Sequence, residues 1–184
     1  TRDVRLLKLQ MDIVSRLPKE YVFLNYLRCH DDIGWGLDYG WLRQFEIGEV
    51  SHKKYLNDFL TGAYPDSFGR GELYNSDPSS GDARLCGTTA SLCGIEKAAY
   101  ERNEPALEQA VQLDLMLHAY MLTQSGIPVI YSGDEIGQEN DYTYHKDPDR
   151  LEDSRYLHRG KFRWDLEPQR KEKGSVQEKL FTGI

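Results

Sequence analysis

The chain has 184 residues, of which 39% are hydrophobic, 29% charged and 11% aromatic. This composition supports a globular domain with an apolar core and excludes a disordered or collagen-like chain. The formal net charge of −7 argues against a nucleic-acid or anionic-membrane partner, because binding phosphates requires a clustered excess of lysine and arginine. No apolar run approaches the roughly 20 residues of a membrane-spanning helix. A neutral substrate fits this composition better.

The cysteines Cys29, Cys86 and Cys93 form no paired motif and leave an odd thiol. They indicate neither a disulfide framework nor a zinc site, and they favour a reducing compartment. The first 20 residues carry charges throughout and lack the apolar core of a signal peptide. We therefore expect a cytoplasmic protein without a metal site.

The first expected element is an amphipathic helix over residues 1–17, where apolar residues recur every three or four positions until Pro18. Residues 21–27 then form a short apolar and aromatic run that ends in a polar cluster at residues 28–32. Such a run is typical of a parallel strand that is buried on both faces. The end of this strand therefore carries the candidate chemistry.

A second helix is expected over residues 107–124, where the apolar residues leave little polar surface, so that this helix should be largely buried. A Ser-Gly pair ends the helix, and residues 127–131 form another short apolar strand that leads to Asp134 and Glu135. The order helix, strand, helix, strand predicts an α/β fold in which both strands are parallel.

Residues 33–104 separate the first strand from the second helix and contain one short helical candidate, at residues 52–60. A strand-to-helix loop normally takes roughly 2 to 6 residues, so we interpret this segment as an inserted substrate-binding subdomain. Its aromatic residues could stack on sugars, but a small core of their own is the favoured interpretation. They are Trp35, Tyr39, Trp41, Tyr64 and Phe68.

The expected organisation has four parts. A helix and a strand occupy residues 1–32, the insertion occupies residues 33–104, and a helix, a strand and an active-site loop occupy residues 105–160. Residues 161–184 form a charged C-terminal tail with a short helix at residues 175–181.

The triplet His30, Asp31 and Asp32 at the end of the first strand has three possible interpretations. As metal ligands, these residues would need partners elsewhere, because adjacent residues of an extended chain point to opposite faces. As structural residues, the aspartates would cap the following turn. As a sugar-binding pair, His30 and Asp31 would hydrogen-bond adjacent hydroxyls of a glycosyl ring and strengthen those bonds as the ring becomes oxocarbenium-like.

Four segments in a fixed order resemble a known family. Across roughly residues 20–160 the chain contains NYLRCHDDIGWG, SFGRGELYNSDPSSGDARLCGTTASLCG, GIPVIYSGDEIGQEND and KDPDRLEDSRYLHR. In combination they resemble the second half of the catalytic domain of the amylosucrases, which belong to glycoside hydrolase family 13, the α-amylase family. The resemblance implies a partial (β/α)8 TIM barrel, made of its last βα units, with a long insertion after the seventh strand.

The resemblance implies roles for five residues. Asp31 would be the catalytic carboxylate that stabilises the transition state, and His30 would bind the glucosyl unit in the −1 pocket. Asp32 and Arg84 would face the fructosyl or acceptor group in the +1 site. Arg155 would close the −1 pocket by pairing with an aspartate from the first half of the domain, and a guanidinium suits this role because it binds a carboxylate bidentately.

Asp134 and Glu135 are not expected to be the acid and the nucleophile. A retaining enzyme holds its two carboxyls about 5 to 5.5 Å apart around the glycosidic bond, and adjacent residues of one strand cannot easily flank the bond in this way. They would instead order the loops at the mouth of the barrel. A full barrel takes about 250 residues, and in this family the nucleophile and the acid/base precede the His-Asp strand. We therefore expect the later half of a barrel, inactive alone, whose partner is the missing first half.

The function that the resemblance implies is retaining transfer of a glucosyl unit from sucrose to an α-glucan or maltooligosaccharide. Hydrolysis would be a side reaction, and no cofactor would be needed. One alternative is a family 13 sucrose hydrolase or α-glucosidase, and another is a non-catalytic carbohydrate-binding module.

Overall fold

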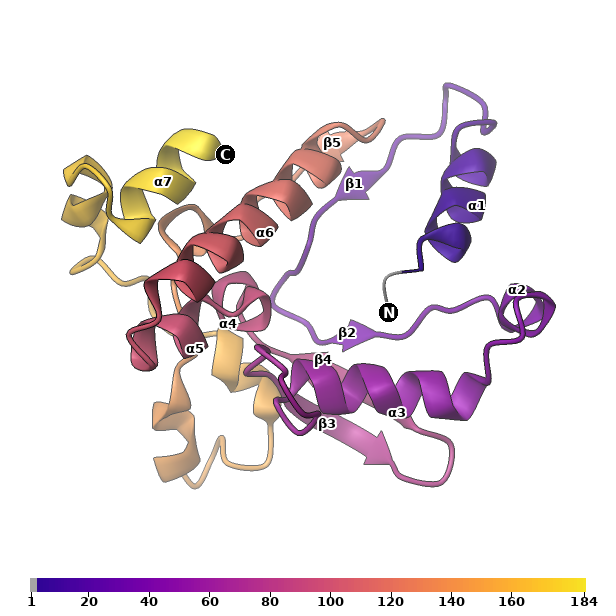
Figure 1. Ribbon diagram of the computed structural model, residues 1–184, viewed down its shortest axis with the longest axis horizontal. Helices are drawn as coiled ribbons and strands as arrows, with labels where there is room; N and C mark the ends of the chain where they lie inside the picture. The colour runs from indigo at the N-terminus through magenta and orange to yellow at the C-terminus, as the bar shows by residue number, and fades with distance from the viewer. Residues whose placement is uncertain (1–2) are drawn as a thin grey trace.

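The computed structural model describes residues 3–184, which form a mixed α/β fold with seven α-helices and two small sheets (Figure 1). The expected α/β class is confirmed, and the strands of this part of the chain do not close into a barrel. Among residues 3–184, none of the helices combines the length and the apolar character that crossing a lipid bilayer requires.

The elements follow one another in short segments. The α-helices are α1 (Arg5–Val14), α2 (Tyr39–Gln44), α3 (Glu49–Leu60), α4 (Thr89–Cys93), α5 (Ile95–Tyr100), α6 (Glu104–Leu122) and α7 (Val176–Gly183). The strands are β1 (Leu24–Asn25), β2 (Ile33–Gly34), β3 (Glu72–Asp77), β4 (Asp82–Cys86) and β5 (Ile127–Pro128). The 3₁₀-helices are η1 (Asp134–Ile136), η2 (Tyr142–Lys146), η3 (Ser154–His158) and η4 (Glu167–Lys171).

Strands β1 and β5 form a two-stranded parallel ladder, in which Leu24 pairs with Ile127 and Asn25 with Pro128. The parallel pairing is the one expected from the sequence. The expectation that the first strand is buried on both faces is wrong, since Leu24 is 64% exposed, and its partner Ile127 is 53% exposed. The reason is tertiary: within residues 3–184 no further strand extends this sheet, and α1 buries none of its residues.

The second sheet is antiparallel, with the strand order β2-β4-β3. Its central strand β4 alternates exposed Asp82 and Arg84 with buried Ala83 and Leu85, as a strand with one covered face does. The sequence analysis predicted only the helix at residues 52–60 in this region, which is confirmed as α3. It missed the sheet and helices α2, α4 and α5, because these elements are only two to six residues long.

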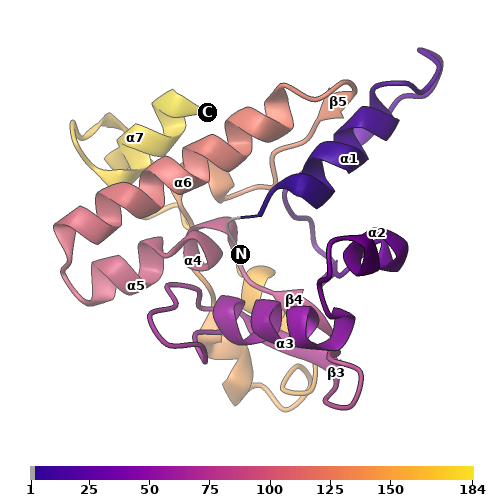
Figure 2. The ribbon, with the colours of Figure 1, turned by 45° about the vertical axis from the view of Figure 1, so that its right-hand side comes forward.

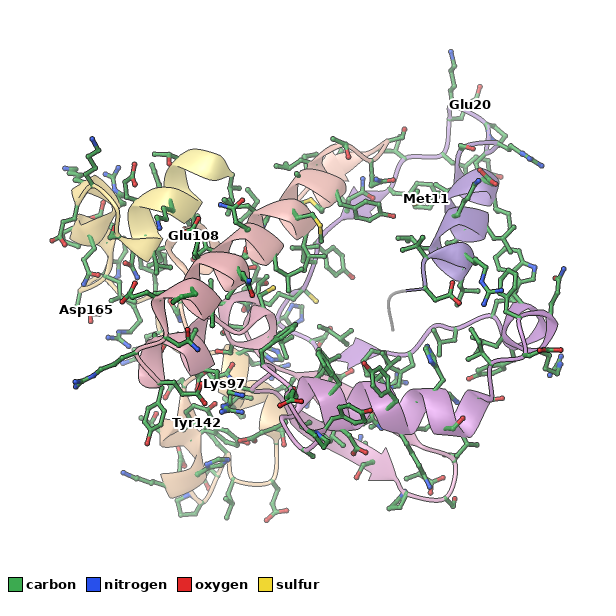
Figure 3. The ribbon with its side chains drawn as sticks, viewed as in Figure 1. Met11, Glu20, Lys97, Glu108, Tyr142 and Asp165 are labelled. Carbon is green, nitrogen blue, oxygen red and sulfur yellow. The ribbon has the colours of Figure 1, made fainter. Side chains whose placement is uncertain are left out.

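The main apolar core lies where α4, α5 and α7 pack against α6, and Figure 2 shows α6 between α7 on one side and α4 and α5 on the other. An ion pair of 2.6 Å joins Lys179 of α7 to Glu108 of α6. Figure 3 labels Glu108 beside α7. Helix α6 is less buried than expected, since Met116 on its outer face is 58% exposed. The core residues are Ala90, Ile95, Ala110, Val111 and Leu180.

Helix α1 has the amphipathic pattern expected from the sequence, but its apolar stripe is largely exposed. It touches the rest of the chain through a few side chains. The Arg5 guanidinium lies 4.5 Å from the centre of the Phe45 ring, and the hydroxyl of Tyr120 contacts the sulfur of Met11. A groove of about 420 Å³ separates α1 from β1 and the end of α6.

Candidate functional site

The chain bends at His30 and Asp31, a few residues after the parallel strand β1, which ends at Asn25. In this bend the Asp31 amide donates to the Cys29 sulfur at 3.4 Å, and His30 Nε2 lies 3.4 Å from Asp31 Oδ2. The two side chains are 67% and 57% exposed. An imidazole and a carboxylate thus stand together at the surface, where a polar ligand can reach both.

Arg159, in the segment after η3, holds this bend from a second side. Its Nε donates to the His30 carbonyl at 2.6 Å, and its Nη2 lies 3.4 Å from Asp31 Oδ1. The sequence analysis did not name Arg159 among the site residues. The signal was available, because Arg159 ends the DSRYLHR segment that carries part of the resemblance.

Arg84 and Asp32 lie next to each other on the antiparallel sheet. Arg84 on β4 is paired in register with Gly34 on β2, and Arg84 Nε is 3.9 Å from Asp32 Oδ1. The Arg84 side chain lies so close over Gly34 that a Cβ atom there would be 1.9 Å from Arg84 Nη1. The glycine therefore lets the guanidinium cross the strand toward Asp32.

Arg155 forms a two-bond pair with Asp153, two residues earlier. Arg155 Nε is 2.8 Å from Asp153 Oδ1, and Arg155 Nη2 is 2.9 Å from Asp153 Oδ2. This hydrogen bonding lowers the pKa of the Asp153 carboxyl. The guanidinium also lies 4.9 Å from the centre of the Tyr74 ring on β3. The nearest carboxylate partner of Arg155 in the chain is thus a neighbour in sequence.

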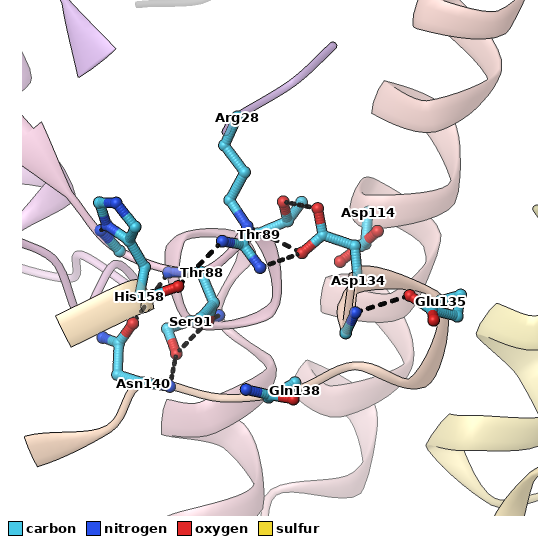
Figure 4. A network of polar contacts seen from close by, with 12 residues as sticks. Arg28, Thr88, Thr89, Ser91, Asp114, Asp134, Glu135, Gln138, Asn140 and His158 are labelled. Atoms are coloured by element: carbon cyan, nitrogen blue, oxygen red, sulfur yellow. Dashed lines mark hydrogen bonds and ion pairs between the residues drawn. The ribbon is translucent and has the colours of Figure 1, made fainter. Parts of the chain in front are cut away.

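Behind the exposed residues lies a buried ion pair between Arg28 and Asp134 (Figure 4). Arg28 Nη2 and Nε are 2.7 and 2.8 Å from Asp134 Oδ1, and the Thr89 hydroxyl donates to Asp134 Oδ2 at 3.1 Å. Burial raises the pKa of the Asp134 carboxyl, and the charge of Arg28 acts against that shift. The Arg28 guanidinium also lies 4.5 Å from the centre of the Tyr131 ring. Asp134 thus joins the end of β1 to the loop after β5.

His158 at the end of η3 is also buried in this network. Its Nδ1 accepts a hydrogen bond from the Gly87 amide at 3.1 Å, and its Nε2 is 3.2 Å from the His30 carbonyl. The backbone carbonyl of His158 accepts a hydrogen bond from Arg28 Nη1 at 3.4 Å. Burial lowers the pKa of the imidazole to about 4. The sequence analysis missed both Arg28 and His158.

Asn140 links two further segments of the same network (Figure 4). Its Oδ1 accepts a hydrogen bond from the Thr88 backbone amide at 2.8 Å, and the backbone amide of Asn140 donates to the Ser91 hydroxyl at 3.0 Å. Thr88 in turn caps the start of α4 by accepting from the Ser91 amide at 3.2 Å. The GTTAS and GQEND parts of the sequence are therefore adjacent in space.

One group in residues 3–184 brings three metal-ligand types together. The ligand atoms of Cys29, His30 and Asp31 lie within 4.8 Å of one another, because the bend turns neighbouring side chains to the same side. The sequence analysis had expected the adjacent side chains of the triplet His30, Asp31 and Asp32 to point to opposite faces, and it had not considered Cys29 as a member of the group. The Arg159 guanidinium beside Asp31 opposes a cation at this place. We therefore assign no metal to the group.

Two of the aromatic residues named for the insertion, Tyr64 and Phe68, pack against other aromatic rings of the same segment. The ring centres of Tyr64 and Tyr55 are 5.0 Å apart, and those of Phe68 and Phe59 are also 5.0 Å apart. Trp35 donates its indole N–H to Asn57 at 2.8 Å. The expected small core is thus present only in part, because Tyr64 and Tyr39 are 44% and 38% exposed.

No protein-family model matches the chain. The exposed Asp31 carboxylate can stabilise positive charge on a bound ligand, and His30 beside it can hydrogen-bond a hydroxyl. Arg84 and Asp32 offer a donor and an acceptor a short distance away. Such a set suits a neutral polyhydroxylated ligand.

Proposed function

We propose that the chain is part of a retaining α-glucoside-active enzyme of glycoside hydrolase family 13, similar to the amylosucrases. The enzyme transfers a glucosyl unit from sucrose to an α-glucan or maltooligosaccharide, with hydrolysis as a side reaction. In this proposal β1 and β5 are the seventh and eighth strands of a (β/α)8 barrel. The sheet β2-β4-β3 belongs to the insertion that follows the seventh strand.

The observation that carries the proposal is the position of Asp31. Asp31 follows the C-terminal end of the parallel strand β1 by six residues, and its exposed carboxylate is 3.4 Å from His30 and 3.4 Å from Arg159. Barrel enzymes build their active sites at this end of their strands. The segments that carry the resemblance lie between residues 25 and 159, and side chains from them are joined by contacts such as Arg28–Asp134.

The proposed role of Asp31 is electrostatic. Its carboxylate stabilises the positive charge that develops on the glucosyl ring as the bond to fructose breaks, and again as the acceptor attacks. His30 hydrogen-bonds a ring hydroxyl, while Asp32 and Arg84 contact the leaving or accepting sugar. Arg159 limits the motion of the Asp31 carboxylate by pairing with Oδ1. The nucleophile and the acid/base come from polypeptide outside this chain.

The test is Asp31→Asn in the protein that combines this chain with the first half of the barrel. Loss of one stabilising charge should lower kcat for sucrose about 100-fold or more while the fold persists. The matched control is Asp165→Asn, since Asp165 is similarly exposed, pairs with Arg163 at 2.5 Å and lies on the α7 side of the molecule (Figure 3). Near-normal turnover of the Asp31 variant would contradict the proposal.

The products separate the alternative functions. Insoluble glucan and free fructose indicate transfer, whereas equal amounts of free glucose and fructose indicate a sucrose hydrolase or α-glucosidase. Binding of maltooligosaccharides in a calorimeter without turnover of any α-glucoside would instead identify a carbohydrate-binding module.

A further inference from the structure

His158 belongs to η3, and its ring contacts two other segments of the chain, at Gly87 after β4 and at His30 after β1. We propose that His158 is a positioning residue that orients the peptide bond between His30 and Asp31 by donating Nε2–H to the His30 carbonyl. The effect on catalysis rests on the proposed function, because Asp31 is the residue that this peptide carries. The hydrogen-bonding arrangement itself does not depend on any substrate.

The tautomer follows from the partner of Nδ1. The Gly87 amide is a donor only, and it points at His158 Nδ1 from 3.1 Å, so Nδ1 must accept and carries no hydrogen. In a neutral imidazole the hydrogen is then on Nε2. Nε2 lies 3.2 Å from the His30 carbonyl, which can only accept. Each ring nitrogen therefore has a partner of the right kind.

The surroundings keep the ring neutral. His158 is 4% exposed, and its burial, together with the charges of Arg28 and Arg159, lowers the pKa of the imidazole. The His30 carbonyl and the Asp32 carboxylate act in the opposite direction but do not reverse the shift. At neutral pH the ring thus has one hydrogen, and the Gly87 contact places it on Nε2.

The peptide between His30 and Asp31 is held at both ends. His158 Nε2 and Arg159 Nε share the His30 carbonyl, at 3.2 and 2.6 Å. On the other side of the same peptide, the Asp31 amide donates to the Cys29 sulfur. The plane of this peptide sets the direction in which the Asp31 side chain leaves the backbone. Among the described residues, no hydrogen bond or ion pair joins His158 to the Asp31 side chain, so its influence passes through the peptide.

Two amide substitutions separate the two hydrogen bonds that the His158 ring makes. In His158→Gln, the side-chain amide reaches the Nε2 position and keeps the donor to His30. In His158→Asn, the shorter amide reaches only the Nδ1 position and keeps the acceptor for Gly87. We expect the Gln variant to retain most of the wild-type kcat. The Asn variant should lose about 10- to 100-fold in kcat with a nearly unchanged KM, because a displaced carboxylate fails mainly in the transition state.

Nuclear magnetic resonance gives the readout that needs no turnover. The ¹⁵N spectrum of the wild-type ring should show an unprotonated Nδ1 and a protonated Nε2 at neutral pH. The ¹⁵N signal of Asp31, which belongs to the peptide in question, should move in the Asn variant and stay near its wild-type position in the Gln variant. A protonated Nδ1, or equal displacement in both variants, would overturn the proposal. Absence of glycoside turnover with these signals as expected would reject only the proposed function.

Discussion

The two small sheets of the molecule are held together in different ways. The antiparallel sheet β2-β4-β3 is hydrogen-bonded along its own strands and buries Leu85 and Cys86 of its central strand. The parallel ladder of β1 and β5 has two residues in each strand and leaves Leu24 and Ile127 exposed. The first sheet is stabilised by backbone pairing and a covered face, and the second has little of either.

Side chains beyond the ends of β1 and β5 supply the contacts that the short backbone pairing of the parallel ladder does not provide. Arg28 and Asp134 are 3% and 2% exposed and join the segments that follow β1 and β5. The Thr89 hydroxyl donates a hydrogen bond to Asp134, and the His158 ring contacts the His30 carbonyl in the same network. The position of the candidate site is therefore set by a buried polar network, and its stability should depend on charges more than that of the antiparallel sheet does.

The largest effect is expected from Asp134→Ala. This change leaves the Arg28 guanidinium buried without its carboxylate, and breaking a buried pair in this way costs about 3 to 5 kcal/mol. Urea denaturation would measure the loss in the free energy of unfolding. The Asp165→Ala variant, at an exposed pair with Arg163, should leave the free energy of unfolding nearly unchanged.

The double variant Arg28→Met/Asp134→Leu sharpens this test. Replacing both charges by apolar groups removes the unpaired ion, so most of the stability lost in Asp134→Ala should return. The same loss in the single and the double variants would show that the packing around Asp134, and not its charge, holds the ladder.

Several elements could be predicted from the sequence because their signals are local. Apolar residues at helical spacing indicated α1, α3, α6 and α7, and the short apolar runs indicated a parallel pair of strands. The exposure of Leu24 could not be predicted, since it depends on which other elements cover the strand. The hairpin of β3 and β4 was missed because its alternating pattern covers only a few residues within a segment rich in glycine, serine and aspartate.

The candidate site shows the same division. His30 and Asp31 were identified by a motif of adjacent residues, and the structure places them together in a bend. Arg28, Asp134 and His158 act through partners that are 106 to 130 positions away in the sequence. No local pattern gives such pairings. A charged residue at the end of an apolar strand was the one clue to Arg28.

Acid should weaken the network through His158. The folded pKa of His158 is lowered from 6.5 to about 4, so between these pH values the unfolded chain binds a proton that the folded chain excludes. The free energy of unfolding should therefore fall as the pH is lowered through this range, by up to about 3 kcal/mol. Urea midpoints at pH 7 and pH 4.5 should differ less in His158→Gln than in the wild type.

His118 provides the control for the sign of this effect. Burial acts to lower its pKa, but the Asp114 carboxylate, whose Oδ1 lies 2.8 Å from His118 Nδ1, outweighs it, so that the pKa of His118 is raised. A group whose pKa is raised on folding stabilises the fold at every pH below its unfolded pKa. This contribution is lost only as the pH rises through the folded pKa. Replacing His118 by Gln should therefore not reduce the loss of stability in acid. A reduction as large as in the His158 variant would contradict the assignment.

A smaller effect, confined to the other sheet, is expected from Lys53→Met. The Lys53 ammonium is buried, and it lies 2.7 Å from Asp82 on β4 and 2.8 Å from Glu49. Methionine keeps the apolar stem but loses both charged hydrogen bonds, at a cost of about 1 to 3 kcal/mol. Hydrogen exchange should accelerate in α3 and β4 and stay unchanged at β1 and β5. Equal acceleration at the parallel ladder would show that the two sheets unfold together.

The smallest effect is expected for two candidate site residues, Arg84 on the central strand β4 and Asp32 directly before the edge strand β2. Their charged atoms are 3.9 Å apart and the Arg84 side chain is 55% exposed, so a double-mutant cycle with Asp32→Asn and Arg84→Gln should give a coupling of about 0.5 kcal/mol or less. Urea denaturation of the four proteins measures this coupling. A coupling as large as that of a buried pair would mean that Asp32 and Arg84 hold the fold. With weak coupling, these two side chains are free to exchange their mutual contact for hydroxyls of a sugar, while the buried network keeps the backbone beneath them in place.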